Sequence, residues 1–148
     1  MRKPFTLEEF KSIYSKVPRL TVDLIVRMNG GIVLSLRTLK SWNNQWHLPG
    51  GTILLHETVE QAVHGVALEE LGIKVNVIKC LGYVEYPSEK EERGYGQAIA
   101  LAMLCDVGSG KLTVNEEASK VELFTVLPEN IIRDQAIFLE RHWHEIIG

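Results

Sequence analysis

Two neighbouring glutamates at the end of a predicted helix are the residues of this sequence best suited to chemistry. Glu69 and Glu70 come just before Gly72, which suits the position after a helix C-terminus. At about 100° per residue, Glu70 falls roughly 20° from Val59, inside the apolar face of the helix, and Glu69 falls at its edge. A carboxylate there is costly unless a cation compensates its charge, and the helix dipole adds negative potential at this end.

A glycine-rich bend upstream of the helix favours the presence of such a cation. Pro49, Gly50 and Gly51 expose backbone carbonyls close to whatever the bend folds around. Carbonyl and carboxylate oxygens are the ligands of a hard cation such as Mg²⁺ or Mn²⁺. A metal in such a site keeps several waters and bridges phosphates, which predicts a diphosphate ligand. The alternative is that the last helical turn leaves the core and Glu70 reaches water.

The elements that position these groups alternate between helices and strands. Capping boxes at Thr6–Glu9 and at Thr58–Gln61 predict helices over about 6–17 and 59–71. The remaining pattern predicts strands over 20–28, 32–37, 75–86, 97–107 and 121–126, a solvated charged loop with Glu89 over 87–93, and a closing helix over 131–147. This order predicts an α/β fold, a mixed β-sheet flanked by helices, in a single domain over 1–148.

Length and charge exclude several classes of partner. A chain of 148 residues suits one domain, and its net charge of −3 gives no basic patch for a long nucleic acid. No apolar run reaches the length of a membrane span, and the N-terminus lacks the apolar core of a signal peptide. We therefore expect a cytoplasmic protein with no membrane partner.

The bend and the helix together resemble the Nudix family, whose box reads G-x5-E-x7-R-E-U-x-E-E-x-G-U, with U a bulky apolar residue. Gly51, Glu57 and the run Glu69-Glu70-Leu71-Gly72-Ile73 match it, and the lead-in from Trp46 to Gly51 matches as well. The resemblance implies a Nudix-type α/β/α sandwich with the box as a loop–helix–loop over about 50–73. It also implies a divalent metal held by the Gly50 carbonyl and Glu70, with Glu69 near.

Two positions depart from the box. Gly65 stands where the family has an arginine, and Val66 where it has a glutamate that is commonly a metal ligand. The family's arginine usually pairs with the first glutamate of the box, so Glu57 is expected to lack its partner. The resemblance then implies a single metal rather than several.

The N-terminal third is most similar to members of the family that resemble GDP-mannose mannosyl hydrolase, which tolerate a change at the same glutamate. This likeness implies substrate contacts from Asp23, inside an apolar strand, and from Arg37 at the end of the next strand. Those enzymes use a histidine base in the loop before the last strand, whereas residues 115–120 contain none. Aligned with them, Glu117 falls at a metal ligand and is a candidate ligand or base.

The function expected from these features is Mg²⁺-dependent hydrolysis of a nucleoside-diphosphate derivative, with a nucleotide sugar favoured. Glu70, Glu69 and Glu117 are the candidate catalytic residues, and the partner is a small-molecule nucleotide. Two alternatives stay open: pyrophosphate cleavage of a dNTP or ADP-ribose type of nucleotide, and a Nudix module that binds a nucleotide without turnover. Relatives are often dimers, and the predicted N-terminal helix could pack across the partner of a homodimer.

Overall fold

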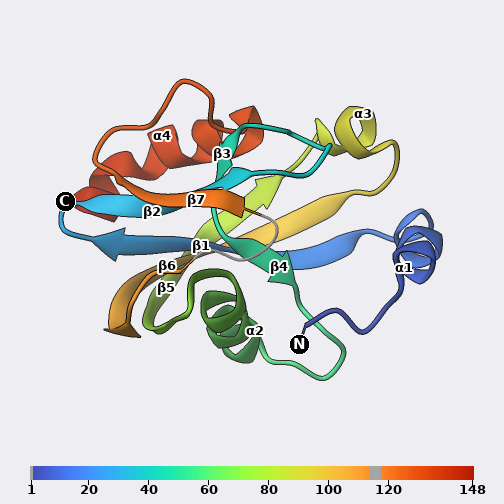
Figure 1. The fold of residues 1–148 in the computed structure, drawn as a ribbon, viewed down its shortest axis with the longest axis horizontal. Helices are drawn as coiled ribbons and strands as arrows, with labels where there is room; N and C mark the ends of the chain where they lie inside the picture. Colours follow the sequence, from blue (N-terminus) through green and yellow to red (C-terminus); the bar gives the residue numbers. More distant parts are fainter. Residues whose placement is uncertain (1, 114–117) are drawn as a thin grey trace.

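The sheet is arranged around strand β1, Arg19–Met28, in a computed structural model that describes residues 2–113 and 118–148 (Figure 1). Residues 21–26 of β1 are all buried. Val22, Leu24 and Val26 join the hydrophobic core on one face of the sheet, and Ile25 joins the core on the other. A strand covered on both faces needs apolar side chains on both, which explains the nearly continuous apolar run in the sequence.

Seven strands of the described residues form a mixed sheet, in which β1 and β6 are parallel and the other paired strands are antiparallel. Besides β1 they are β2 (Gly31–Arg37), β3 (Trp46–His47), β4 (Gly50–Thr52), β5 (Ile73–Glu85), β6 (Ala98–Gly110) and β7 (Ala118–Phe124). The order along the sheet is β3-β2-β1-β6-β5, with β4 paired to β1 and β7 paired to β2.

Strand β1 changes partner along its length. Its last residues, Arg27 and Met28, pair with the start of β2, whereas residues 21–23 pair with β4. Beyond the hairpin, β2 instead pairs with β7 and β3. The far end of β2 is therefore not paired with β1. Residues 21–23 of β1 have β4 as their neighbour instead.

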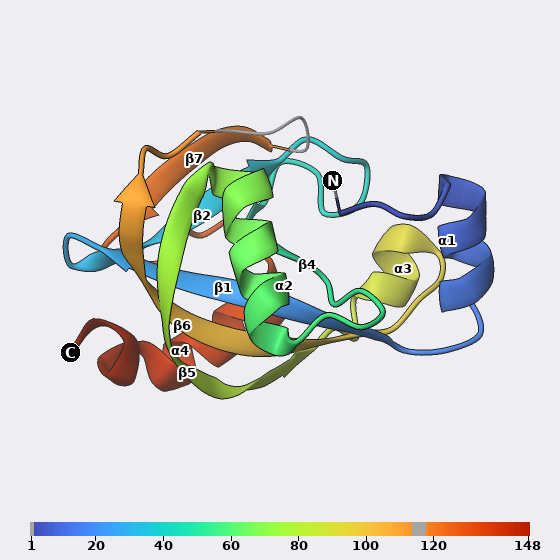
Figure 2. The ribbon, with the colours of Figure 1, turned by 90° about the horizontal axis from the view of Figure 1, so that it is seen from below.

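The helices cover both faces of the sheet, as Figure 2 shows. Helix α2 (Val59–Val66) continues into a π-helical turn, η1 (Ala67–Leu71), and both pack on one core cluster, while α4 (Arg133–Ile147) packs on the other. Helices α1 (Leu7–Tyr14) and α3 (Glu89–Arg93) lie near one another at one end of the sheet. None of the described helices has the length and apolar character that crossing a membrane requires.

The α/β fold with a mixed sheet flanked by helices, expected from the sequence, is confirmed. Three local expectations are wrong. The first helix ends at Tyr14 rather than near residue 17, the helix over 59–71 changes to a π turn at Ala67, and the supposed charged loop contains α3. Glu89 in α3 is buried rather than solvated, because its carboxylate accepts a hydrogen bond from the Ala98 amide and faces two arginines.

The N-terminal cap of α2 gives a first prediction. The Thr58 hydroxyl accepts a hydrogen bond from the Gln61 amide at 3.1 Å, and the Gln61 side chain accepts one from the Thr58 amide at 2.9 Å. Thr58→Ala should lower the free energy of unfolding by about 1 kcal/mol, because an amide of the first turn loses its acceptor. Urea denaturation measures this. Thr58→Ser keeps the acceptor and should stay within roughly 0.5 kcal/mol of wild type; equal losses in both variants would contradict the cap.

Candidate active site

A cavity of about 600 Å³ is lined by β1, β4 and the far end of β2, where β2 is no longer paired with β1. Every described residue that the sequence singled out for the site lines it: Asp23, Arg37, Gly50, Glu69 and Glu70. The remaining candidate, Glu117, lies outside the described residues. Residues from three strands and one helix end thus come together around a single hollow.

The glycine bend allows β4 to approach both β1 and α2 closely. A β-carbon on Gly50 would lie 2.6 Å from Asp23 Oδ1 and 2.7 Å from the Val22 carbonyl oxygen, which is too close for any side chain. A β-carbon on Gly51 would lie 3.0 Å from Val66 Cγ2 on α2. The two glycines therefore let the strand that carries the candidate metal-binding carbonyl lie directly between β1 and the box helix.

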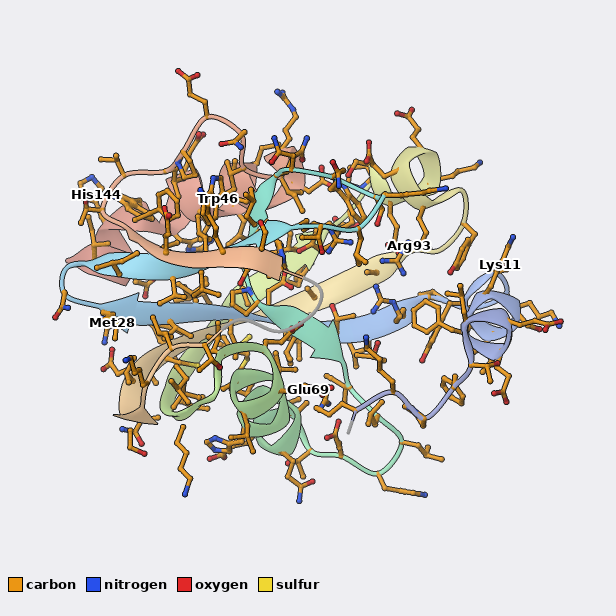
Figure 3. The ribbon with its side chains drawn as sticks, in the orientation of Figure 1. Lys11, Met28, Trp46, Glu69, Arg93 and His144 are labelled. Atoms are coloured by element: carbon orange, nitrogen blue, oxygen red, sulfur yellow. The ribbon has the colours of Figure 1, made fainter. Side chains whose placement is uncertain are left out.

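The two glutamates of the box lie on η1. There the Gly72 amide donates to the carbonyls of both Ala67 and Leu68, which is the wide hydrogen-bonding pattern of a π turn. A π turn rotates the chain less per residue than an α turn, and Leu71 is fully buried at its end. Glu70 is half-buried and Glu69 is exposed, and both line the cavity. Figure 3 marks the position of Glu69 at the end of the box helix. Such turns are frequent at functional sites.

The donor set fits a hard divalent cation that relies partly on its substrate. Among residues 2–113 and 118–148, no three acidic, histidine or cysteine side chains gather closely enough to form a complete metal site. Two adjacent carboxylates and a backbone carbonyl line the cavity instead. Mg²⁺ is commonly bound by one or two carboxylates, with waters and substrate phosphates as its other ligands.

Asp23 is the end of a buried polar network. The Tyr86 hydroxyl donates to Asp23 Oδ2, Gln135 Nε2 lies 2.9 Å from the Tyr86 hydroxyl oxygen, and the Leu48 amide donates to Gln135 Oε1 at 2.7 Å. Burial raises the pKa of Asp23 to about 7, although the hydrogen bond from Tyr86 and the charge of Arg19 oppose this shift. Burial and the neighbouring Asp23 likewise raise the pKa of Tyr86 well above its ordinary value.

Arg37 extends from the end of β2 into the same cavity. Its Nε donates to the Ser41 carbonyl at 2.9 Å and its Nη2 to the Ser41 hydroxyl at 3.0 Å, while its guanidinium lies 5.4 Å from the Trp42 ring centroid. Trp42 is itself held by a hydrogen bond from its indole nitrogen to Ser88. The strand end and the 41–42 loop thus fix the orientation of the guanidinium that is expected to contact the substrate.

The end of the cavity beside α1 combines aromatic rings with arginines, and the sequence analysis missed it. Arg19 lies 5.2 Å from the Phe10 centroid, and Arg93 lies 5.7 Å from the same ring. Both arginines also lie within 4 Å of the buried Glu89 carboxylate. Burial, and then the charge of Arg93, lower the pKa of Arg19. The signal available in the sequence was the spacing of Phe10 and Tyr14, because residues four apart on a helix lie on the same face.

Arg2 is a further site residue that the sequence pattern did not indicate. Its Nη2 donates to Glu57 Oε1 at 2.5 Å and to the Thr52 carbonyl at 2.9 Å, and its amide donates to Glu69 Oε2 at 3.2 Å. The expectation that Glu57 lacks a partner is therefore wrong. No helical or strand periodicity links residue 2 to residue 57, which is why pattern analysis could not find this pair.

Comparison with known proteins agrees with this architecture. The family model described as NUDIX domain matches residues 17–142. The low-salt glycan biosynthesis protein Agl8 of Haloferax volcanii is 31% identical over 120 residues, 79% of this chain and 77% of the relative. An ADP-ribose pyrophosphatase of Methanocaldococcus jannaschii is 32% identical over 125 residues, 79% and 72% of the two chains. The solved MutT NUDIX hydrolase of Burkholderia pseudomallei has a TM-score of 0.75 at 27% identity, covering 84% of this chain and 97% of its own.

The raised pKa of Asp23 predicts a distinctive dependence of stability on pH. The native state keeps this proton to about pH 7, whereas the unfolded state loses it near 3.8, so stability falls as pH rises between these values. Asp23→Asn does not titrate, so its free energy of unfolding relative to wild type should rise by about 2–4 kcal/mol from pH 4 to pH 8. Chemical denaturation of both proteins in EDTA measures this difference, and a constant difference would contradict a raised pKa.

Proposed function

Because the chain belongs to the NUDIX domain family, we propose that it hydrolyses a nucleoside-diphosphate derivative with the help of a divalent metal, Mg²⁺ or Mn²⁺. The observation that carries the proposal is that Gly50, Glu69 and Glu70 line one cavity with several basic side chains. Those basic residues are Arg2, Lys3, Arg19, Arg37 and Arg93. Carboxylates for a metal and cations for phosphate oxygens are together the groups that a diphosphate requires.

In this proposal Glu70, Glu69 and the Gly50 carbonyl hold the metal, and Glu117 is a further ligand or the general base. A bound divalent ion supplies neutralisation of the charge on the diphosphate and lowers the pKa of an attacking water. Arg37 contacts a phosphate oxygen through its guanidinium, whose orientation its contacts with Ser41 and Trp42 already fix. Preorganised donors of this kind lower the barrier because they need not reorganise during the reaction.

We favour a nucleotide sugar as the substrate. Asp23, with a pKa of about 7, is part protonated at neutral pH and can both donate to and accept from a sugar hydroxyl. The rings of Phe10 and Tyr95 and the guanidinium of Arg93 offer flat surfaces to a nucleobase at the other end of the cavity. The Haloferax relative is named as a glycan biosynthesis protein, which supports a sugar-linked nucleotide.

The second candidate is cleavage of the pyrophosphate bond itself. The ADP-ribose pyrophosphatase of Methanocaldococcus jannaschii, at 32% identity, favours it. The two reactions need the same diphosphate site and differ in the atom that water attacks, the anomeric carbon of the sugar or a phosphorus. A module that binds a nucleotide without turnover is the third possibility, because Gly65 and Val66 replace two polar residues of the box.

Removal of one carboxylate tests the metal site. Glu70→Gln keeps the shape of the side chain and removes the charge that holds the metal, so metal-dependent turnover should fall by at least ~100-fold. The matched control is Glu60→Gln on α2, where an exposed carboxylate pairs only with His64 among the described contacts, and wild-type turnover is expected. Steady-state kinetics over a range of Mg²⁺ concentrations give the measurement. Activity of Glu70→Gln within a few-fold of wild type would remove the central claim.

Reaction in ¹⁸O-labelled water distinguishes the two chemistries. Attack at the anomeric carbon places the label in the released sugar and leaves an unlabelled nucleoside diphosphate, which is the outcome we expect. Attack at phosphorus places it in a nucleoside monophosphate or a sugar phosphate and would establish the second candidate. The screen should include nucleoside-diphosphate sugars, ADP-ribose and dNTPs, analysed by mass spectrometry. Tight binding without turnover of any substrate would identify a binding module.

A further inference from the structure

The side chain of Arg2 occupies the space that a residue at position 65 would otherwise fill. A β-carbon built on Gly65 would lie 2.6 Å from Arg2 Nε and 2.8 Å from Arg2 Cδ. A β-carbon on Gly51 would lie 3.2 Å from Arg2 Nη1. Glycines on both the helix and the bend thus leave a groove into which this side chain fits, and its buried Nε lies against Gly65 rather than against an acceptor.

Arg2 ties three parts of the site together. Its guanidinium joins the Glu57 carboxylate to the Thr52 carbonyl, and the same Glu57 oxygen accepts from the Leu54 amide at 2.8 Å. The side chains of Arg2 and Glu57 are only 12% and 22% exposed, so water screens this ion pair weakly. Because the guanidinium is anchored, the backbone amide of residue 2 is held where it donates to Glu69.

We propose that Arg2 is a positioning residue that takes over, from a distant part of the chain, the role of the arginine missing at position 65. It neutralises Glu57, closes the loop between β4 and α2, and orients Glu69 for the metal. This inference rests on the proposed function only where it concerns the metal. The packing of Arg2 against Gly65 stands on geometry alone. A partner that orients a metal ligand typically changes metal affinity by 10- to 100-fold.

A double-mutant cycle on the metal-free protein tests the shared space. Gly65→Ala should lower the melting temperature by roughly 3–6 °C in the wild-type background, because the new methyl group displaces Arg2 from Glu57. In an Arg2→Ala background the same substitution should raise it by roughly 2–4 °C, because the groove is empty and alanine favours a helix over glycine. Equal shifts in both backgrounds would overturn the proposal.

The positioning role is tested by Mn²⁺ binding without nucleotide, followed by electron paramagnetic resonance. Arg2→Ala should weaken Mn²⁺ binding by about 10-fold. The double variant that combines Arg2→Ala with Gly65→Arg should bind Mn²⁺ within about 3-fold of wild type. Lys16→Ala removes an exposed charge of the N-terminal segment and should leave affinity unchanged. Unchanged affinity in Arg2→Ala, or failure of the Gly65→Arg rescue, overturns the role. If Arg2→Ala does not fold, Arg2→Met, which keeps the side-chain stem, replaces it for the affinity measurement alone, because that stem still fills the space beside Gly65 that the rescue needs.

These measurements separate the inference from the proposed function. Suppose that wild type hydrolyses no nucleotide, that the effect of Gly65→Ala on the melting temperature changes sign between the two backgrounds, and that Arg2→Ala weakens Mn²⁺ binding. The proposed function then fails and the positioning role of Arg2 stands. If wild type is active but the cycle is additive and Mn²⁺ affinity does not change, the inference fails alone.

Discussion

The concentration of negative charge at the end of the box helix is the constraint on which the site depends. Glu69 and Glu70 follow one another where the helix dipole is also negative, and both face a cavity rather than bulk solvent alone. Such a pair is tolerable when donors and cations surround it. The backbone amide of Arg2 supplies one donor to Glu69, and the basic residues across the cavity supply charge that a phosphate ligand would share.

Local chemistry made much of the fold predictable. The capping box at Thr58 starts α2 where the sequence indicates, and Gly72 adopts the left-handed conformation expected after the helix. The apolar run of β1 reflects burial on both faces of the sheet. Each of these signals acts within a few residues, so the amino-acid sequence alone is enough to detect it. The convergence of Gly50 and Glu70 on one cavity could also be predicted, because only a short loop joins the glycine bend to the helix.

Contacts between distant segments were not predictable in this way. Arg2 meets Glu57 across 55 residues of sequence, and Glu89 is buried where Arg19 of β1 approaches it, beside Arg93 of its own helix. A charged residue in a polar stretch usually indicates solvent exposure, and only tertiary structure reverses that expectation. The π turn at the end of the box helix was likewise not predictable from the sequence, because placing residues at about 100° each assumes a constant α-helical rotation.

The two departures from the box have a common structural consequence. Val66 is 2% exposed and packs into the core beside Gly51, so the helix gains apolar contact where the family has a charged residue. Gly65, next to it, leaves the groove that Arg2 fills. Any larger residue at position 65 requires the Arg2 side chain to shift, so the two positions constrain each other. The altered box is therefore better understood as a site that takes its arginine from another part of the chain than as one that has lost it.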